Sequence, residues 1–441
     1  MFLSRDSLAY VRILRMDFQH DINDIMIRTI SPSLERAVSR MTGVQHFLCP
    51  IKRLFLPSVC RCLFLTAAAT LQSVNISPYG DDRPTRKRSA DAWAEDTFVE
   101  YSPTCPQLTQ LTLNLDCLCS TSTFFSYIRS LVSSHAAQLR SLSVGPGYAD
   151  FTYKVLHPDD PRVWPRLERL EVDASALSWA WWSNAPAVTS LTLSGSLSLD
   201  DSGRDDNHHR EEHDISSPNA RRAARIKALS VYFLNLQELS CEASVLPFML
   251  PAKAPTPRPI RKLELNWANS IHQGLDEFAT HAPRWPIVLR ALSFIPHFGA
   301  PVRELSFPVR ELDLALLASA APYLKTVESL LLVPVPWRSP LREDSALTQL
   351  GEGLFAHMPR LHTFVLSDGY LSRNMYACFR IHDWDMELSW LETWQVHAPV
   401  LHTVAFTHKY KWMKTERGWG SDDEKISEWL DSGGREEEEQ D

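Results

Sequence analysis

The sequence predicts an α/β fold in which parallel β-strands are covered on one face by helices. Two observations predict it. A short apolar pattern with the period of a β-strand returns along most of the chain, and segments with helical apolar spacing precede several of its copies. The chain has 441 residues, of which 44% are hydrophobic, so it has ample material for a packed core.

The recurring pattern is Pro-x-apolar-x-x-apolar-x-apolar. Its last triplet alternates with period two, so both apolar side chains face one side of a short strand. The proline ends a preceding helix, because it lacks an amide hydrogen and disfavours helical geometry in the residue before it. Five copies contain the proline and begin at Pro106, Pro165, Pro186, Pro359 and Pro399, and five copies without it begin at Leu71, Leu139, Leu236, Ile260 and Val302. A sixth copy with proline begins at Pro322 and breaks down at Ser329.

Helical spacing precedes several copies. Apolar residues recur every three or four positions over 346–355, after a possible cap at Ser345. The same spacing occurs over 388–394 and over 124–131. A helix, a stop and a strand therefore follow one another repeatedly.

These residues resemble leucine-rich repeats, whose consensus is L-x-x-L-x-L-x-x-N/C-x-L. The copies that begin at Leu108, Leu167 and Leu361 extend to the last leucine of the consensus, at Leu118, Leu177 and Leu371, although none has Asn or Cys at the ninth position. The ragged spacing between copies resembles the leucine-rich region of fungal F-box-type proteins. The resemblance implies a solenoid of about ten repeats, with a curved parallel sheet on the concave face and helices on the convex face.

Both ends of the chain add to this likeness. Leu388, Leu391 and Trp394, followed by the copy at Pro399, resemble the closing repeat of such proteins, and the segment 10–18 resembles the one that follows their F-box. No F-box is recognisable, since Leu56-Pro57 does not continue as that module does. The resemblance implies a non-enzymatic protein-binding adaptor, a candidate substrate-recognition subunit of a cullin-type ubiquitin ligase with a cullin adaptor subunit as a partner. A stand-alone scaffold, or an enzyme with its pocket in the inserts, are the alternatives.

We predict one irregular solenoid over residues 1–415. Two polar inserts, 80–95 and 200–225, are expected to be mobile loops, and 420–441 an acidic disordered tail in which Ile426, Trp429 and Leu430 are the apolar group. The last twenty residues hold ten acidic and two basic residues, which accounts for the whole net charge of −8. The neutral body argues against a nucleic-acid partner.

Other sequence features favour a cytoplasmic or nuclear protein without a membrane span. The first residues lack a secretory apolar run, and the most apolar stretch, 54–69, contains a proline and an arginine and is read as buried protein. Eight dilute cysteines indicate reduced thiols, and Cys60 with Cys62 and Cys117 with Cys119 are interpreted as core residues on strand faces.

We expect no catalytic residue, no cofactor and no metal site. His208, His209 and His213 lie close together, but their polar surroundings offer no packed shell to hold a metal. No phosphate-binding, nucleophile-elbow or zinc-protease motif occurs. The tryptophans could be interface anchors, although packing is the favoured interpretation; they are Trp179, Trp181, Trp182, Trp267, Trp337 and Trp412.

The candidate binding site is the set of strand residues that point away from the core. This concave face is expected to be polar, neutral and wide, which suits another protein's surface better than a small substrate. Its members are Gln110, Thr112, Asn114, Arg169, Glu171, Asp173, Ser190, Thr192, Lys262, Glu264, Asn266, Thr363 and Ser367.

Overall fold

The structure, a computed structural model, has an α/β fold of mostly parallel strands and helices. It describes residues 7–15, 32–49, 57–76, 104–113, 122–145, 152, 155–156, 162–174, 176, 183–194, 233–249, 257–266, 285–309, 314–334, 344–366, 384–406 and 410–432. The chain forms two compact units, one of Met1–Leu236 with Asn269–His272, the other of Gln237–Ala268 with Gln273–Asp441. Among the described helices, none is both long enough and apolar enough to cross a bilayer.

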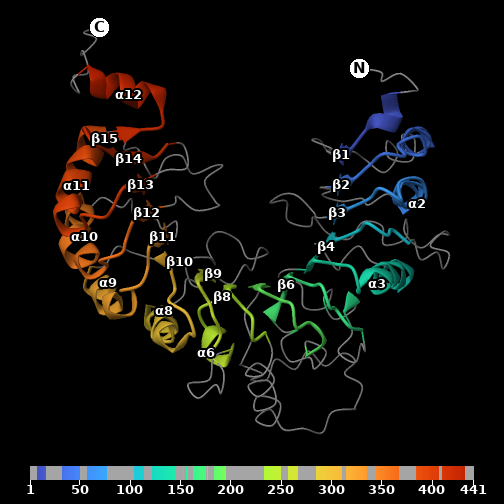
Figure 1. The fold of residues 1–441 in the computed structure, drawn as a ribbon, viewed down its shortest axis with the longest axis horizontal. Helices are drawn as coiled ribbons and strands as arrows, with labels where there is room; N and C mark the ends of the chain where they lie inside the picture. The colour runs from blue at the N-terminus through green and yellow to red at the C-terminus, as the bar shows by residue number, and fades with distance from the viewer. Residues whose placement is uncertain are drawn as a thin grey trace, which may run out of the picture. The chain divides into compact units, whose positions relative to one another are not determined.

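The first unit contains seven described strands, and each pairs in parallel with the next one along the chain. The helices α2 and α3 lie to one side of these strands (Figure 1). The strands are β1 (Ile13–Arg15), β2 (His46–Cys49), β3 (Ser73–Ile76), β4 (Gln110–Leu113), β5 (Ser141–Val144), β6 (Arg169–Asp173) and β7 (Ser190–Ser194). The helices are η1 (Ser7–Tyr10), α2 (Pro57–Thr66) and α3 (Ser122–His135).

The second unit contains β8 (Glu238–Glu242), β9 (Lys262–Asn266), β10 (Glu304–Val309), β11 (Ser329–Pro334), β12 (Thr363–Leu366), β13 (Thr403–Ala405), β14 (Trp412–Thr415) and β15 (Gly418–Ser421). Neighbours from β8 to β13 pair in parallel, whereas β14 pairs antiparallel with β13 and with β15. Its helices are α6 (Leu246–Met249), α8 (Trp285–Leu292), η6 (Ile295–His297), α9 (Leu314–Ala320), η7 (Ala321–Tyr323), α10 (Asp344–Gly353), η8 (Phe355–His357), α11 (Trp384–His397) and α12 (Glu424–Asp431). Figure 1 shows α8 to α11 along one side of the strands.

The core of each unit is built from aligned rows of apolar side chains. In the first unit, register places one residue of each strand in a single row that is almost fully buried from β2 onward: Phe47, Val74, Leu111, Leu142, Leu170 and Leu191. In the second unit the corresponding row is Leu239, Leu263, Leu305, Leu330, Phe364 and Val404. Register is tightly specified because a one-residue slip would turn the whole row outward.

All ten predicted strand positions are confirmed, since each copy of the apolar pattern ends on one of the strands β3 to β10, β12 or β13. The other five described strands were missed or misplaced: no copy of the pattern was assigned to β1, β2, β14 or β15, and the copy for β11 was misplaced. The copy that begins at Val44 and ends on β2 was missed. The copy from Pro322 was set three residues too early, because the buried triplet runs from Val327 through Leu330 to Leu332.

The predicted helices are confirmed as α3, α10 and α11. The interpretation of Cys60 and Cys62 as a pair on a strand face is wrong, because both lie in α2. This helix begins at Pro57. Leu63 and Phe64, near its end, and Ala67, in the turn that follows, are fully buried. Proline is well placed there, because the first helical residue has no intrahelical use for its amide hydrogen.

The expectation of a disordered tail over 420–441 is wrong for residues 420–432. β15 extends to Ser421, and α12 follows with a side-chain cap at Asp423 and with Ile426 and Trp429 buried. The apolar group that looked isolated in the sequence is therefore the packed side of a helix. The rest of the tail and both predicted inserts, 80–95 and 200–225, lie outside the described residues.

Candidate functional site

The candidate site is the outward face of the strands, formed by the side chains that alternate with the buried rows. Its geometry starts at the residue just before each strand, which we call the lead residue. The carbonyl oxygen of Glu168 accepts hydrogen bonds from two amides of the next strand segment, Thr189 at 2.9 Å and Ser190 at 3.0 Å. The carbonyl oxygen of Arg140 likewise accepts from Glu168 and Arg169. The lead residues of neighbouring strands are therefore held side by side.

The same double acceptance occurs through both units. In the first unit, the accepting lead residues are Arg12, Gln45, Gln72, Thr109, Arg140 and Glu168. In the second unit they are Gln237, Arg261, Arg303, Glu328 and His362. Since parallel strands are about 4.8 Å apart, lead side chains of neighbouring strands come within reach of one another.

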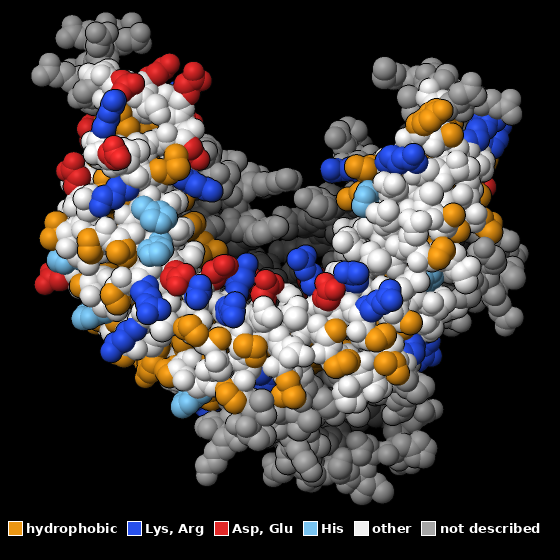
Figure 2. Space-filling view, in the orientation of Figure 1, with side chains coloured by type: hydrophobic (Ala, Val, Ile, Leu, Met, Phe, Trp, Pro, Cys, Tyr) orange, Lys and Arg blue, Asp and Glu red, His pale blue; other side chains and the backbone are white. Residues whose placement is uncertain are grey.

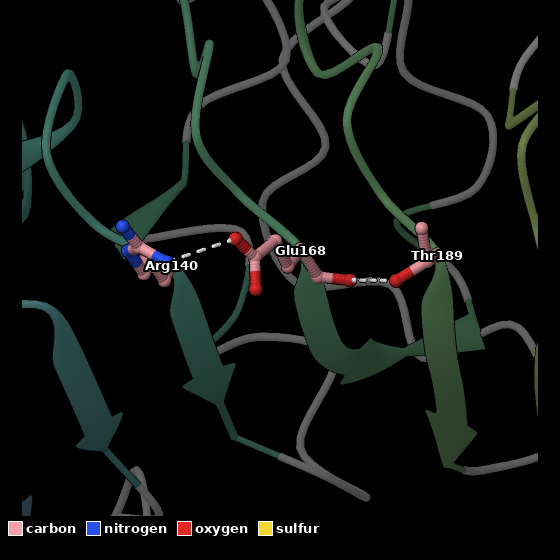
Figure 3. Close-up of polar contacts among 3 residues, drawn as sticks. All are labelled: Arg140, Glu168 and Thr189. Atoms are coloured by element: carbon pink, nitrogen blue, oxygen red, sulfur yellow. Dashed lines mark hydrogen bonds and ion pairs between the residues drawn. The ribbon is translucent and has the colours of Figure 1, made fainter.

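Charged lead residues use this proximity to form ion pairs. Figure 3 shows Arg140 directed at Glu168, with 3.3 Å between Nη1 and Oε1, and Thr189 beside the backbone oxygen of Glu168. In the second unit, Arg303 and Glu328 form an equivalent pair with 3.7 Å between Nε and Oε1. These pairs are solvent-exposed, so each contributes about 1 kcal/mol or less to stability. Their main effect is to fix charges of known sign on the surface.

The first outward row of the second unit carries a further ion pair. Lys262 of β9 and Glu304 of β10 are paired by strand register, and Nζ lies 3.6 Å from Oε2. Figure 2 shows Lys, Arg, Asp and Glu side chains interspersed over β8 to β10. Both signs are present in close alternation, so this part of the face has no single dominant charge.

The structure places ten of the thirteen predicted site residues at outward positions that are exposed or half-buried. They are Gln110, Thr112, Arg169, Glu171, Ser190 and Thr192 in the first unit and Lys262, Glu264, Asn266 and Thr363 in the second. Asp173 is also in an outward position but is only 5% exposed, so it does not belong to the accessible face as predicted. Asn114 and Ser367 lie outside the described residues.

Hydrogen bonds order several of these side chains. The hydroxyl of Ser143 donates to Glu171 across neighbouring strands at 2.7 Å, and the amide of Asn266 donates to the hydroxyl of Ser240. At the end of β8, burial raises the pKa of Glu242, and a contact with Ser244 partly offsets that rise. The outward side chains are thus held in place by their neighbours.

The sequence did not reveal that the face changes character within the second unit. The second outward row is polar at Ser240, Glu264 and Ser306, then becomes apolar at Leu331 and Val365. Its expected polarity is therefore wrong for β11 and β12. The run of four apolar residues from Leu330 to Val333 was an available signal, because strands that are apolar on both faces read as continuous runs. The charged lead residues had no such signal, since their proximity depends on strand register.

Three of the described thiols, those of Cys49, Cys105 and Cys241, are unsuited to nucleophilic chemistry. Burial raises the pKa of Cys49 to about 12 and that of Cys105 to about 11, and it also raises the pKa of Cys241. A thiol with so high a pKa stays protonated near neutral pH, and the thiolate is the reactive form. Among the described residues, no group of three or more His, Cys, Asp or Glu side chains could hold a metal ion. His208, His209 and His213 lie outside that part of the chain.

Of the six tryptophans considered as interface anchors, Trp412 is the one among the described residues. It is fully buried, and its Nε1 donates to Glu387 at 2.6 Å. The packing interpretation is therefore confirmed for this residue. Trp179, Trp181, Trp182, Trp267 and Trp337 lie outside the described residues, as do Cys117 and Cys119.

A comparison with models of known protein families finds no match, and a comparison with curated proteins finds no significant match. The case for a function therefore rests on the residues and their geometry.

Proposed function

We propose that this chain is a non-enzymatic protein-binding module, an irregular leucine-rich-repeat solenoid that recognises another protein through the outward face of its strands. The observation that carries the proposal is the set of ion-paired and exposed charges at matched positions of neighbouring strands. Arg140 with Glu168 and Arg303 with Glu328 repeat one arrangement of lead residues in both units, and Lys262 with Glu304 adds a pair in the first outward row of the second unit. A broad surface with charges of both signs selects a partner by complementary charge rather than by enclosure.

The chain is, in this proposal, a substrate-recognition subunit of a cullin-type ubiquitin ligase in the cytoplasm or nucleus. This step is supported by the likeness of its repeats and its closing segment to fungal F-box-type proteins. A stand-alone scaffold with the same face is the alternative. Nucleic acid, membranes and cofactors have no part in the proposal.

Charge reversal on the face tests the binding role. Lys262→Glu and Arg169→Glu each change an exposed outward residue, and Arg290→Glu makes the same change on helix α8, away from the strands. Proteins co-purified from the native cell would be identified and quantified for each variant. We expect specific partners to be retained by Arg290→Glu and lost by at least one face variant. Equal recovery with all variants would refute the outward face as the binding site.

The same purification tests the ligase assignment separately. A substrate receptor must recover a cullin adaptor subunit with the wild-type chain. Specific partners without any cullin component would leave the binding module standing and identify the chain as a scaffold.

A further inference from the structure

His362 and His402 form a pair of neighbouring imidazoles on the second unit. They are the lead residues of β12 and β13, and both side chains are exposed. Their ring centroids lie 5.4 Å apart, and the two ring planes meet at 34°. Figure 2 shows His side chains next to each other over these strands. The two rings are therefore close enough to share one ligand.

The backbone holds the two histidines at a fixed separation. The carbonyl oxygen of His362 accepts hydrogen bonds from the amide of His402 at 3.0 Å and from that of Thr403 at 3.1 Å. The strands continue in parallel register, with Phe364 beside Val404 and both of these side chains fully buried. Because the backbone is already aligned, a ligand shared by the two imidazoles has only side-chain rotation to order.

The separation of the rings matches that of two imidazoles on one tetrahedral metal ion. In zinc sites each imidazole nitrogen lies about 2.0–2.1 Å from the ion, which places the centres of two bound rings roughly 5 Å apart. The angle between the ring planes is compatible with this arrangement, because each bound ring can turn about its bond to the ion. Imidazole is also the commonest metal ligand among side chains, and it suits zinc, copper and nickel.

The surroundings leave ring nitrogens available to a metal. Nδ1 of His402 lies 3.0 Å from Oγ1 of Thr403. With its proton on Nδ1, the ring donates to this hydroxyl and keeps the lone pair of Nε2, an arrangement typical of metal-binding histidines. Among the described residues, no group forms a hydrogen bond to the ring of His362. Glu328, the lead residue on the other side of His362, is paired with Arg303, so its carboxylate is not a third ligand.

We propose that His362 and His402 together bind a divalent transition-metal ion, and that Zn²⁺ is an ion that fits their spacing. Each histidine supplies one imidazole nitrogen, and water fills the two remaining tetrahedral positions. This departs from the expectation of no metal site, because only the strand register brings the two residues together. The inference goes beyond the proposed function, since it concerns metal binding by the chain alone and needs no protein partner.

Chemical modification locates the ion on the full-length wild-type chain. Diethylpyrocarbonate acylates free imidazole nitrogens, and mass spectrometry of the digested chain quantifies the modification of each histidine. We expect Zn²⁺ to protect His362 and His402 over the same range of concentration, while His357, which is exposed in η8, stays reactive. Mg²⁺ prefers oxygen ligands and should protect neither member of the pair. Protection of only one member or of neither by Zn²⁺ would overturn the proposal, as would equal protection by Mg²⁺.

Substitutions test whether the two rings share one ion. Equilibrium dialysis against a Zn²⁺ concentration that fully protects the pair, followed by elemental analysis, compares the wild type with His362→Gln, His402→Gln and the double variant. Each single variant should lose one bound ion, and the double variant should lose the same ion and no more. His357→Gln is the matched control and should bind as much Zn²⁺ as the wild type does. Loss of two ions by the double variant would mean two independent sites, and unchanged binding by the single variants would mean no site; either result would overturn the proposal.

Discussion

The imidazole of His135 and the backbone of Cys105 form a buried hydrogen bond that joins the end of α3 to the segment that leads into β4. Nε2 of His135 accepts from the amide of Cys105 at 2.9 Å, while Nδ1 lies 2.7 Å from the carbonyl of Leu131. Both contacts require the neutral ring with its proton on Nδ1. The histidine is 1% exposed, and burial lowers its pKa below the usual 6.5.

Stability should therefore depend on pH through His135. The unfolded chain binds the proton near pH 6.5, whereas the folded chain binds it only at lower pH, so the contribution is fully present above about pH 6.5 and is lost as pH falls. Its slope can reach about 1.4 kcal/mol per pH unit. Urea denaturation at a series of pH values checks this. His135→Gln keeps an acceptor for Cys105 but does not titrate, so its slope below pH 6.5 should be smaller; identical slopes would contradict the assignment.

Glu387 of α11 should be essential for holding Tyr410 and the strand β14 against that helix. Its carboxylate is 2% exposed and accepts from the hydroxyl of Tyr410 at 2.8 Å and from the indole of Trp412 at 2.6 Å. Glu387→Ala leaves both donors buried without this acceptor, so we expect a loss of about 3 kcal/mol. Thermal melts monitored by tryptophan fluorescence measure it. Glu392→Ala, at an exposed position of α11, is the control and should change stability by less than about 0.5 kcal/mol.

The strand assignment in β6 predicts opposite outcomes at adjacent positions. Leu170→Asp places a carboxylate in a row that is 2% exposed and should cost about 3 kcal/mol or more. Glu171→Ala removes one outward hydrogen bond, from Ser143, and should cost about 1 kcal/mol or less. Chemical denaturation of both variants compares them, and similar losses would mean that the strand is assigned to the wrong register.

The helix α12 should depend on its cap. Asp423 accepts from the amide of Lys425 at 3.0 Å and from that of Ile426 at 3.4 Å. Asp423→Ala should destabilise the helix by about 1 kcal/mol. Hydrogen exchange over residues 424–432 should become faster in this variant and remain unchanged in Asp431→Ala, which alters an exposed acid at the other end of the helix. Uniformly fast exchange over these residues in the wild-type chain would contradict the helix and support the original expectation of a disordered tail.

Most strands were predictable because the residues that form the buried rows alternate with outward residues, and this alternation is visible in the sequence. The copy from Pro359 through Leu361 and Phe364 to Leu366 reads directly as β12. β11 was placed three residues too early because Pro322 fits the proline position of the pattern. The buried pair of this strand is Leu330 and Leu332. α12 was missed because its composition is acidic, even though an Asp cap precedes apolar residues at helical spacing.

The outward positions could be predicted from the same alternation. Which outward side chains lie side by side, and how exposed each one is, could not. Nothing in the local sequence indicates that Arg140 lies beside Glu168, since 28 residues separate them and only the strand register joins them. The accessibility of Asp173 also depends on neighbouring chain rather than on strand period. A site spread over many strands is therefore only partly readable from one sequence.

The carbonyl that receives two amides has a consequence for chain length between strands. Gln72 and Thr109 are 37 residues apart and Glu168 and Thr189 are 21 apart, yet each pair makes this connection. These hydrogen bonds align neighbouring strands at the residue before each strand begins. The segments that connect the strands can therefore differ greatly in length without changing the strand register. Such connectors are natural places to graft a reporter, a tag or a foreign domain while the sheet beneath keeps its pairing.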